Sequence, residues 1–245
     1  MIQDLHSHTY YSYCGKDSPE DVIKNAIAEG IDVVGISDHY YGIVINRPGF
    51  VYENHEYMMW LHNRALRSYY EHIKCLAEKY KDHIDVRCGI EISCMDLGYT
   101  FLPDGVDVSF FDYCLIEYID TKESVVDDLF AFAKRIGCKN TGVAHTDLIA
   151  YAKSKGISAE EFFNDMAEQN IFWELNVNYD SIHKYREHQY VKDFFENEDI
   201  SNLVKKKGLK LSVGFDGHNL EDYDGKRVKQ ACLKLEEMGM NVINF

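Results

Sequence analysis

Histidine, aspartate and glutamate side chains gather in five short segments, HSH, SDH, GIE, AHTD and FDGH, which are spread over most of the chain. The residues of interest in them are His6, His8, Asp38, His39, Glu91, His145, Asp216 and His218. His6 and His8 are two positions apart, and alternate residues of an extended strand point to the same side. The two imidazoles can therefore bind one ion together, so metal binding is the first chemistry to consider.

Imidazole and carboxylate groups are ligands that suit zinc, iron or manganese. A carboxylate such as Glu91 can bridge two ions. Two ions held a few Å apart lower the pKa of a shared water, orient it and stabilise a leaving oxygen. This chemistry fits phosphate ester hydrolysis. A single histidine at a strand end is more often packed or hydrogen-bonded, but five such segments are not independently expected.

Short β-rich segments alternate with longer helical segments along the chain. The expected strands are 2–6, 31–37, 84–93, 111–119, 141–145, 171–177 and 209–215. The expected helices are 18–29, 53–80, 123–136, 158–169, a segment within 187–207, and 225–238. The run IDVVGIS is almost continuously apolar, as expected of a parallel strand buried on both faces. The last residues, NVINF, are a candidate for a short terminal strand.

Seven β-then-α units predict an α/β fold, a closed or nearly closed (β/α) barrel similar to a TIM barrel. An open doubly wound sheet is the alternative, but the GxGxxG turn of a nucleotide-binding fold is absent after the first strand. The potential metal ligands in the five segments, called metal-type residues below, lie near or just past the C-terminal ends of their strands. In a parallel barrel these ends converge on one rim, where active sites are built. We therefore expect residues that are distant in the sequence to share one pocket.

Charge and composition exclude several classes of protein. The 245 residues include 41 Asp and Glu against 26 Lys and Arg, which gives a formal net charge of −15. A surface with this much negative charge repels nucleic-acid phosphates and anionic lipid headgroups. We therefore expect neither nucleic acid nor a membrane as a partner. A small phosphorylated substrate is compatible, because bound cations reverse the field inside a site. No linker-like stretch stands out, and we expect one domain over residues 1–245.

Cysteine usage and the N-terminal residues bear on the compartment. The seven cysteines form no CxxC pair, and buried thiols in a reducing compartment explain most of them. The N-terminus MIQDLHSH has no basic segment followed by an apolar run, so no signal peptide is expected. No apolar stretch approaches the roughly 20 residues that cross a bilayer. We therefore expect a cytoplasmic protein, and the sequence leaves its oligomeric state open.

The segments HSH, SDH, GIE, AHTD and FDGH, in this order between Ile2 and His218, resemble the successive motifs of the PHP (polymerase and histidinol phosphatase) family. The resemblance implies a distorted seven-stranded (β/α) barrel with two or three divalent ions, which would be zinc, manganese or iron. It implies one ion held by His6, His8, Glu91 and Asp216, a second held with help from Glu91 and His145, and a third held by His39 and His218. It also implies that Asp38 orients a ligand. The predicted catalytic residues are Asp38, Glu91 and His218.

Two positions depart from the family pattern. Many members place a histidine six residues after the HxH pair, where this chain has Cys14. Cysteine can bind zinc, so Cys14 is a candidate ligand, with a packed or solvent-facing thiol as the alternative. Many members also carry a histidine just after the fourth strand, near Ile119 in this chain. Glu117 or the adjacent Asp120 is a candidate oxygen ligand there, and for Glu117 a charged rim residue is the alternative.

Phosphate recognition favours basic groups near the rim. Lys16, Arg47 and Arg186 follow the first, second and sixth strands, and each is either a substrate-binding residue or a solvated surface charge. The remaining histidines are expected to be surface or structural residues off this rim. They are His55, His62, His72, His83, His183 and His188.

These observations predict a metal-dependent phosphoesterase that hydrolyses a small phosphorylated metabolite with a metal-activated water. The segment YYEHIKCLAEKY resembles the histidinol-phosphatase branch of the family, which makes histidinol phosphate one candidate substrate. An amidohydrolase that cuts C–N bonds is the rival enzyme, but its carboxylated lysine has no candidate, since Glu91 and Glu117 stand near the ends of the middle strands. The non-enzymatic alternative is a metal-binding regulatory protein that has lost catalysis, which the two departures would support.

Overall fold

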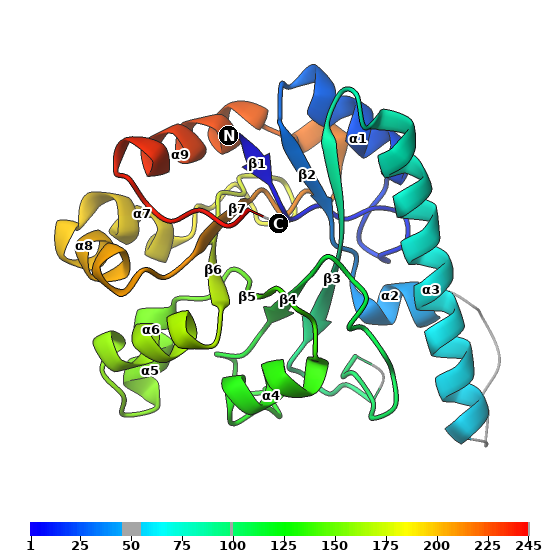
Figure 1. The fold of residues 1–245 in the computed structure, drawn as a ribbon, viewed down its shortest axis with the longest axis horizontal. Helices are drawn as coiled ribbons and strands as arrows, with labels where there is room; N and C mark the ends of the chain where they lie inside the picture. The colour runs from blue at the N-terminus through cyan, green and yellow to red at the C-terminus, as the bar shows by residue number, and fades with distance from the viewer. Residues whose placement is uncertain (46–54, 99, 245) are drawn as a thin grey trace.

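The computed structural model describes residues 1–45, 55–98 and 100–244 of the chain (Figure 1). Seven strands form its centre. They are β1 (Gln3–Asp4), β2 (Val33–Ile36), β3 (Asp85–Ser93), β4 (Tyr113–Glu117), β5 (Thr141–Val143), β6 (Ile171–Asn176) and β7 (Leu211–Gly214). Each strand pairs in parallel with the next one along the chain. The seven predicted strands are confirmed, with shorter bounds than expected.

The first and last strands meet, which makes the sheet a nearly closed barrel. The backbone N–H of Leu5 donates to the carbonyl of Val213 at 2.9 Å, and Ser7 forms a parallel bridge with Gly217. The predicted α/β barrel of the TIM-like kind is therefore confirmed, and the C-terminal strand ends meet at one rim. The terminal strand expected at NVINF is reduced to a single bridge between Val242 and Leu211.

Helices surround the barrel on its outer side (Figure 1). They are α1 (Pro19–Ala28), α2 (Tyr40–Ile45), α3 (His55–Tyr80), α4 (Leu129–Ile136), α5 (Leu148–Ser154), α6 (Ala159–Glu168), α7 (Gln189–Glu196), α8 (Glu198–Lys207) and α9 (Gly225–Glu237), with a short 3-10 turn, η1 (Leu220–Asp222). Two of these, α2 and α5, were not expected from the sequence, because each is only one to two turns long and follows a strand directly.

Side-chain caps decide where several helices begin. The side chain of Ser18 accepts a hydrogen bond from the N–H of Asp21, as expected for the start of α1. The predicted helix 123–136 begins only at α4, because Asp128 caps it with its carboxylate. The predicted helix within 187–207 is two helices, because Asn197 ends α7 and its side chain caps α8.

Glycines make room for aromatic rings inside the barrel. Tyr113 and Glu117 are four residues apart in β4, so they point to the same side, into the barrel. Tyr113 is fully buried and its hydroxyl donates to the carbonyl of Leu5 at 2.7 Å. A Cβ at Gly89 would lie 2.2 Å from Cζ of Tyr113, and one at Gly35 would lie 2.1 Å from its Oη. The ring therefore occupies space that only glycines in β2 and β3 leave open.

Gly89→Ala is expected to lower the free energy of unfolding by about 1–3 kcal/mol, because the new methyl group overpacks the interior against Tyr113. Denaturant unfolding followed by circular dichroism measures this change. Ser68→Ala, on an exposed position of α3, is the control and should leave the midpoint unchanged. An equally unchanged midpoint for Gly89→Ala would contradict the tight packing of the Tyr113 ring.

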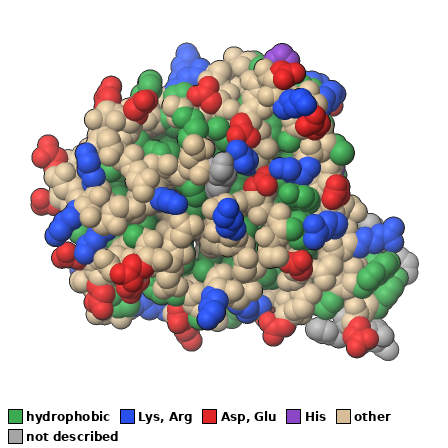
Figure 2. Space-filling view, in the orientation of Figure 1, with side chains coloured by type: hydrophobic (Ala, Val, Ile, Leu, Met, Phe, Trp, Pro, Cys, Tyr) green, Lys and Arg blue, Asp and Glu red, His purple; other side chains and the backbone are tan. Residues whose placement is uncertain are grey.

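Within the described part of the chain, no helix combines the length and the apolar character that crossing a bilayer requires. Figure 2 shows acidic and basic side chains interspersed on one face of the molecule, with hydrophobic side chains scattered between them. On this face, charges of both signs are mixed and do not form a patch of one sign.

Candidate metal centre

The metal-type residues predicted from the sequence come together on the C-terminal rim of the barrel. Six strands place them: His6 and His8 follow β1, Asp38 and His39 follow β2, Glu91 lies in β3, Glu117 ends β4, His145 follows β5, and Asp216 and His218 follow β7. His145 is half-buried and the others are buried. The closed parallel barrel thus brings together side chains that are far apart in the sequence. His6 and His218, for example, are separated by 212 positions.

Three residues at the ends of β4, β5 and β7 have left-handed backbone conformations. Their φ angles are 60° at Tyr118, 30° at His145 and 58° at Asp216. Such conformations are unfavourable for residues other than glycine and persist where surrounding contacts hold them. The N–H of His145 donates to Glu174 at 2.8 Å, and the N–H of Asp216 donates to the carbonyl of His6 at 2.7 Å. These hydrogen bonds fix the two turns that carry metal-type side chains.

Glu91 is the hub of the buried centre. Its Oε1 lies 3.2 Å from Nε2 of His6 and 3.2 Å from Nε2 of His145. Its Oε2 lies 2.8 Å from Nδ1 of His39 and 3.4 Å from Nε2 of His8. Each carboxylate oxygen therefore faces two imidazoles. This arrangement suits a carboxylate that bridges two ions.

Asp216 faces the same centre from β7. Its Oδ1 lies 3.0 Å from Nε2 of His8, 3.4 Å from Nε2 of His6 and 3.8 Å from Nε2 of His218. His6, His8 and Asp216 each offer a ligand atom within 4.8 Å of the others. This group coincides with three of the four residues predicted to hold one ion.

Cys14 joins a second group of potential ligands. His8, Cys14, His39 and His218 offer ligand atoms that all lie within 4.8 Å of one another. Burial alone would raise the pKa of the Cys14 thiol, but its hydrogen bonds with His218 and His39 lower that pKa below its usual value. A thiolate is the form of cysteine that binds metals. Cys14 thus lies where the sequence suggested a ligand in place of histidine.

Several buried polar atoms in this centre make no well-aligned hydrogen bond, although those of His39, Glu91 and Glu117 lie in ion-pair contact with one another. They are Nδ1 of His39, Oε2 of Glu91, both carboxylate oxygens of Glu117, and Nδ1 of His218. Burying such groups without well-aligned hydrogen bonds is costly. His39, Glu91 and Glu117 also form one group of ligand atoms within 4.8 Å. Divalent cations would supply the missing partners, and this set of imidazole, carboxylate and thiol donors suits zinc. The residues present therefore fit a bound metal centre.

The pKa values of His8 and Asp216 follow from burial and neighbouring charges. Burial, with repulsion from His218 and His39, lowers the pKa of His8 to about 3. Burial would raise the pKa of Asp216, but the charges of His6 and His218 hold it well below its usual value. His8 is therefore neutral and Asp216 ionised at neutral pH, which are the forms that bind metals.

Glu174 is a residue of the site that sequence reasoning missed. It is buried in β6, and its Oε1 lies 2.7 Å from Nδ1 of His6. Its Oε2 accepts from the N–H of His145 at 2.8 Å and from Nδ2 of Asn176 at 3.2 Å. Because a carboxylate accepts, Nδ1 of His6 donates to Glu174, and its Nε2 faces Glu91. The available signal was a glutamate inside the apolar run IFWELN, which is a costly place for an unpaired charge.

Asp38 lies behind the centre and holds the loop after β1. It accepts hydrogen bonds from the N–H and the hydroxyl of Thr9, both at 2.7 Å. It also accepts from the N–H of Ser12 at 3.0 Å and from its hydroxyl at 2.7 Å. The hydroxyl of Ser12 in turn lies 3.2 Å from Nδ1 of His8. Asp38 therefore reaches His8 through Ser12, as a positioning residue.

Two of the three predicted phosphate-binding residues lie outside the buried centre. Lys16 and Arg186 are exposed, and Arg47 lies outside the described residues. The backbone of Lys16 lies close to the rim, because its N–H donates to the carbonyl of His218 at 3.0 Å. Lys16 and Arg186 therefore make no part of the buried ligand set.

His183 and His188 were expected to be surface or structural residues off the rim, and this expectation was wrong. Nε2 of His183 lies 3.6 Å from Oδ2 of Asp216, and the ring centroid of His188 lies 6.4 Å from that of His145. The loop between β6 and α7 returns to the rim, and its sequence has no periodic pattern that would reveal this path.

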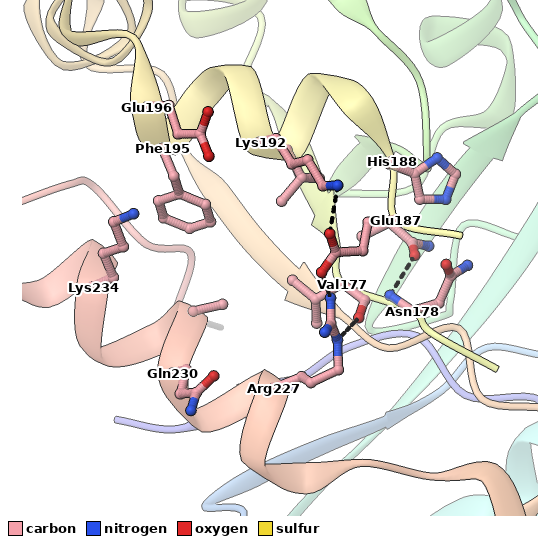
Figure 3. Close-up of a pocket in the computed structure, with 13 residues that line it drawn as sticks. Val177, Asn178, Glu187, His188, Lys192, Phe195, Glu196, Arg227, Gln230 and Lys234 are labelled. Atoms are coloured by element: carbon pink, nitrogen blue, oxygen red, sulfur yellow. Dashed lines mark hydrogen bonds and ion pairs between the residues drawn. The ribbon is translucent and has the colours of Figure 1, made fainter. Parts of the chain in front are cut away.

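A cavity of about 430 Å³ lies beside the centre, between α7 and α9 (Figure 3). Asn176 and His188 are among its lining residues. Nζ of Lys192 lies 2.7 Å from Oε2 of Glu187, and Nη2 of Arg227 lies 2.5 Å from Oε1 of the same residue (Figure 3). Because both cations point at Glu187, they are not directed at the buried centre.

Comparisons with known proteins agree with this architecture. The PHP domain family matches residues 4–235. A protein of Thermotoga maritima named "Probable histidinol-phosphatase" is 33% identical over 113 residues, a match that spans 46% of this chain and only 37% of that relative. The crystal structure of histidinol phosphate phosphatase from Lactococcus lactis, in complex with zinc, L-histidinol and phosphate, superposes with a TM-score of 0.63 over 99% of this chain and 95% of that one. The sequence identity to it is 17%, so this likeness shows a shared fold.

Proposed function

This chain belongs to the PHP domain family, and we propose that it is a metal-dependent phosphoesterase acting on a small phosphorylated metabolite. The observation that carries the proposal is Glu91, whose two oxygens each face two imidazoles at 2.8–3.4 Å inside a closed barrel. A carboxylate in this position is suited to bridging neighbouring ions. On this proposal residues 1–245 act as one metallohydrolase domain.

Three groups of side chains would hold the ions. The groups are His6, His8, Glu91 and Asp216; Glu91, Glu117 and His145; and Cys14, His39 and His218. Bound divalent cations would activate a water and neutralise the phosphoryl oxygens. Zinc suits the thiol-containing group, and manganese or iron are alternatives for the groups made only of imidazoles and carboxylates.

The residues of the chain supply orientation and charge. Glu174 holds the ring of His6 through a 2.7 Å contact, and Asp38 holds the loop that carries His8. Glu91 and His218 would bind ions of the centre itself, which a substrate phosphate would approach. Lys16, Arg47 and Arg186 are proposed contacts for the phosphate or the rest of the substrate. Support for histidinol phosphate as the substrate comes from the names of the Thermotoga and Lactococcus proteins.

Hydrolysis of 4-nitrophenyl phosphate tests the proposal directly. The purified protein, reconstituted with zinc or manganese, is expected to release nitrophenol, and His6→Ala is expected to abolish the release. His83→Ala is the matched control, because His83 is an exposed histidine outside the centre. Bound metal by elemental analysis, with no turnover of aryl phosphates, histidinol phosphate or amides, would instead favour a metal-binding regulatory protein.

Cys14→Ser is expected to remove the near-ultraviolet charge-transfer band of the cobalt(II)-loaded protein, because only a thiolate ligand produces that band. Cys75→Ser, which changes an exposed thiol, should keep the band and serves as the control. Absorption spectra of the two cobalt(II)-loaded variants give the comparison. A band of equal intensity in Cys14→Ser would show that Cys14 does not contact the metal.

A further inference from the structure

The loop between β6 and α7 carries a histidine–aspartate pair that the proposed ligand set does not use. Asp180 is buried, whereas 28% of the His183 side chain is exposed. Oδ1 of Asp180 lies 2.7 Å from Nδ1 of His183 and accepts from its backbone N–H at 2.8 Å. These contacts orient the ring of His183, with Nδ1 facing Asp180 and Nε2 turned toward Asp216.

This arrangement repeats the one around His6. There, Nδ1 contacts the carboxylate of Glu174 at 2.7 Å and Nε2 lies 3.4 Å from Oδ1 of Asp216. In His183, Nδ1 contacts Asp180 at 2.7 Å and Nε2 lies 3.6 Å from Oδ2 of Asp216. A carboxylate that takes one ring N–H while the other ring nitrogen faces a metal is the usual environment of a metal-bound histidine.

His218 is related to the same two carboxylates. Its Nδ1 is buried without a hydrogen-bond partner and lies 3.9 Å from Oδ2 of Asp180. Its Nε2 lies 3.8 Å from Oδ1 of Asp216. Asp180 thus stands behind two imidazoles that face different oxygens of Asp216. Asp180, His183 and His218 also offer ligand atoms within 4.8 Å of one another.

The spacing between His183 and Asp216 leaves room for an ion held by both side chains. When Nδ1 carries the proton, Nε2 presents a lone pair to a carboxylate oxygen, and two such groups repel each other. Their 3.6 Å separation exceeds an ordinary hydrogen bond. It is close to the distance between two ligands of one tetrahedral ion, which is about 3.4 Å for bonds of roughly 2.1 Å. A cation bound between them would remove this repulsion and is compatible with the spacing.

We propose that His183, oriented by Asp180, is a further metal ligand that binds through Nε2 to a divalent ion shared with Asp216. The inference rests on the metal centre of the proposed function and extends it to the β6–α7 loop. Because His183 is partly exposed, this ligand stands on the solvent side of the centre, where the substrate would enter.

The test uses the full chain loaded with cobalt(II), because each coordinated histidine gives a hyperfine-shifted, exchangeable N–H signal in the proton NMR spectrum. His183→Asn is expected to lose one such signal, and His83→Asn, at an exposed position, is expected to lose none. Asp180→Asn keeps the imidazole and removes its carboxylate, so cobalt(II) affinity should fall by about 10–100-fold. Circular dichroism confirms that the variants are folded.

Two results would overturn the inference: an unchanged set of shifted signals in folded His183→Asn, or an unchanged cobalt(II) affinity in Asp180→Asn. Phosphatase activity of the wild-type protein is a separate readout. A wild-type protein that shows the His183 signal and hydrolyses no phosphate ester keeps His183 as a ligand and ends the proposed function. If the wild-type protein hydrolyses phosphate esters and His183→Asn loses no shifted signal, the proposed function stands and His183 is not a ligand.

Discussion

Glu91→Gln is expected to lower kcat/KM for 4-nitrophenyl phosphate by at least about 10³-fold, which corresponds to roughly 4 kcal/mol of transition-state stabilisation. Each oxygen of Glu91 faces two imidazoles, so the residue is common to the first two ligand groups. The amide keeps the shape but loses the negative charge, and its NH2 group cannot bind a cation. Steady-state kinetics and the metal content of the same preparation measure the effect.

Glu20→Gln is the matched control for this substitution. Glu20 lies on α1, where it pairs with Lys79 at 2.6 Å and accepts from the hydroxyl of Tyr80 at 2.6 Å. The same chemical change at this partly exposed position should leave both activity and metal content near the wild-type values. If Glu91→Gln kept wild-type kcat/KM and the full complement of metal, Glu91 would not be the hub of the centre.

Removal of the metal is the second change with a large expected effect. A chelator should abolish hydrolysis and lower Tm by roughly 8–16 °C, if the ions are present at about a thousand times their Kd. The stabilisation arises because the ions bind the folded rim and compensate the buried carboxylates of Glu91, Glu117 and Asp216. Differential scanning calorimetry with and without chelator, followed by addition of zinc or manganese, measures loss and recovery.

Glu91→Gln also serves as the control for the chelator experiment. A variant that holds less metal has less stabilisation to lose, so the chelator should shift its Tm by much less than it shifts the wild-type Tm. A wild-type protein of confirmed metal content whose Tm and activity both survived complete removal of the ions would contradict the metal-dependent mechanism.

The barrel itself could be predicted because its signals are local and repeated. Apolar runs such as IDVVGIS and IFWELN mark strands that are buried on both faces, and seven such units with intervening helices leave few alternative folds. Boundaries were less accurate where a single cap decided them, as at Asp128 before α4 and at Asn197 between α7 and α8. A cap depends on the conformation of one residue, which a periodic pattern does not record.

The main residues of the candidate centre could also be predicted from the sequence. His6, His39, Glu91, His145 and Asp216 all stand near strand ends, and a parallel barrel brings such ends to one rim whatever the helices between them do. The chain alone therefore specified the fold class and the ring of imidazoles and carboxylates, because both follow from periodicity and from position along each strand.

Contacts between side chains across the barrel could be identified only in the tertiary structure. Glu174 behind His6, Asp180 behind His183, and the meeting of Cys14 with His39 and His218 join segments that no sequence period relates. They depend on which face of β6 a side chain occupies and on the path of two loops over the rim. Side-chain packing in three dimensions sets that geometry, so it became visible only when the seven strands were closed into one barrel.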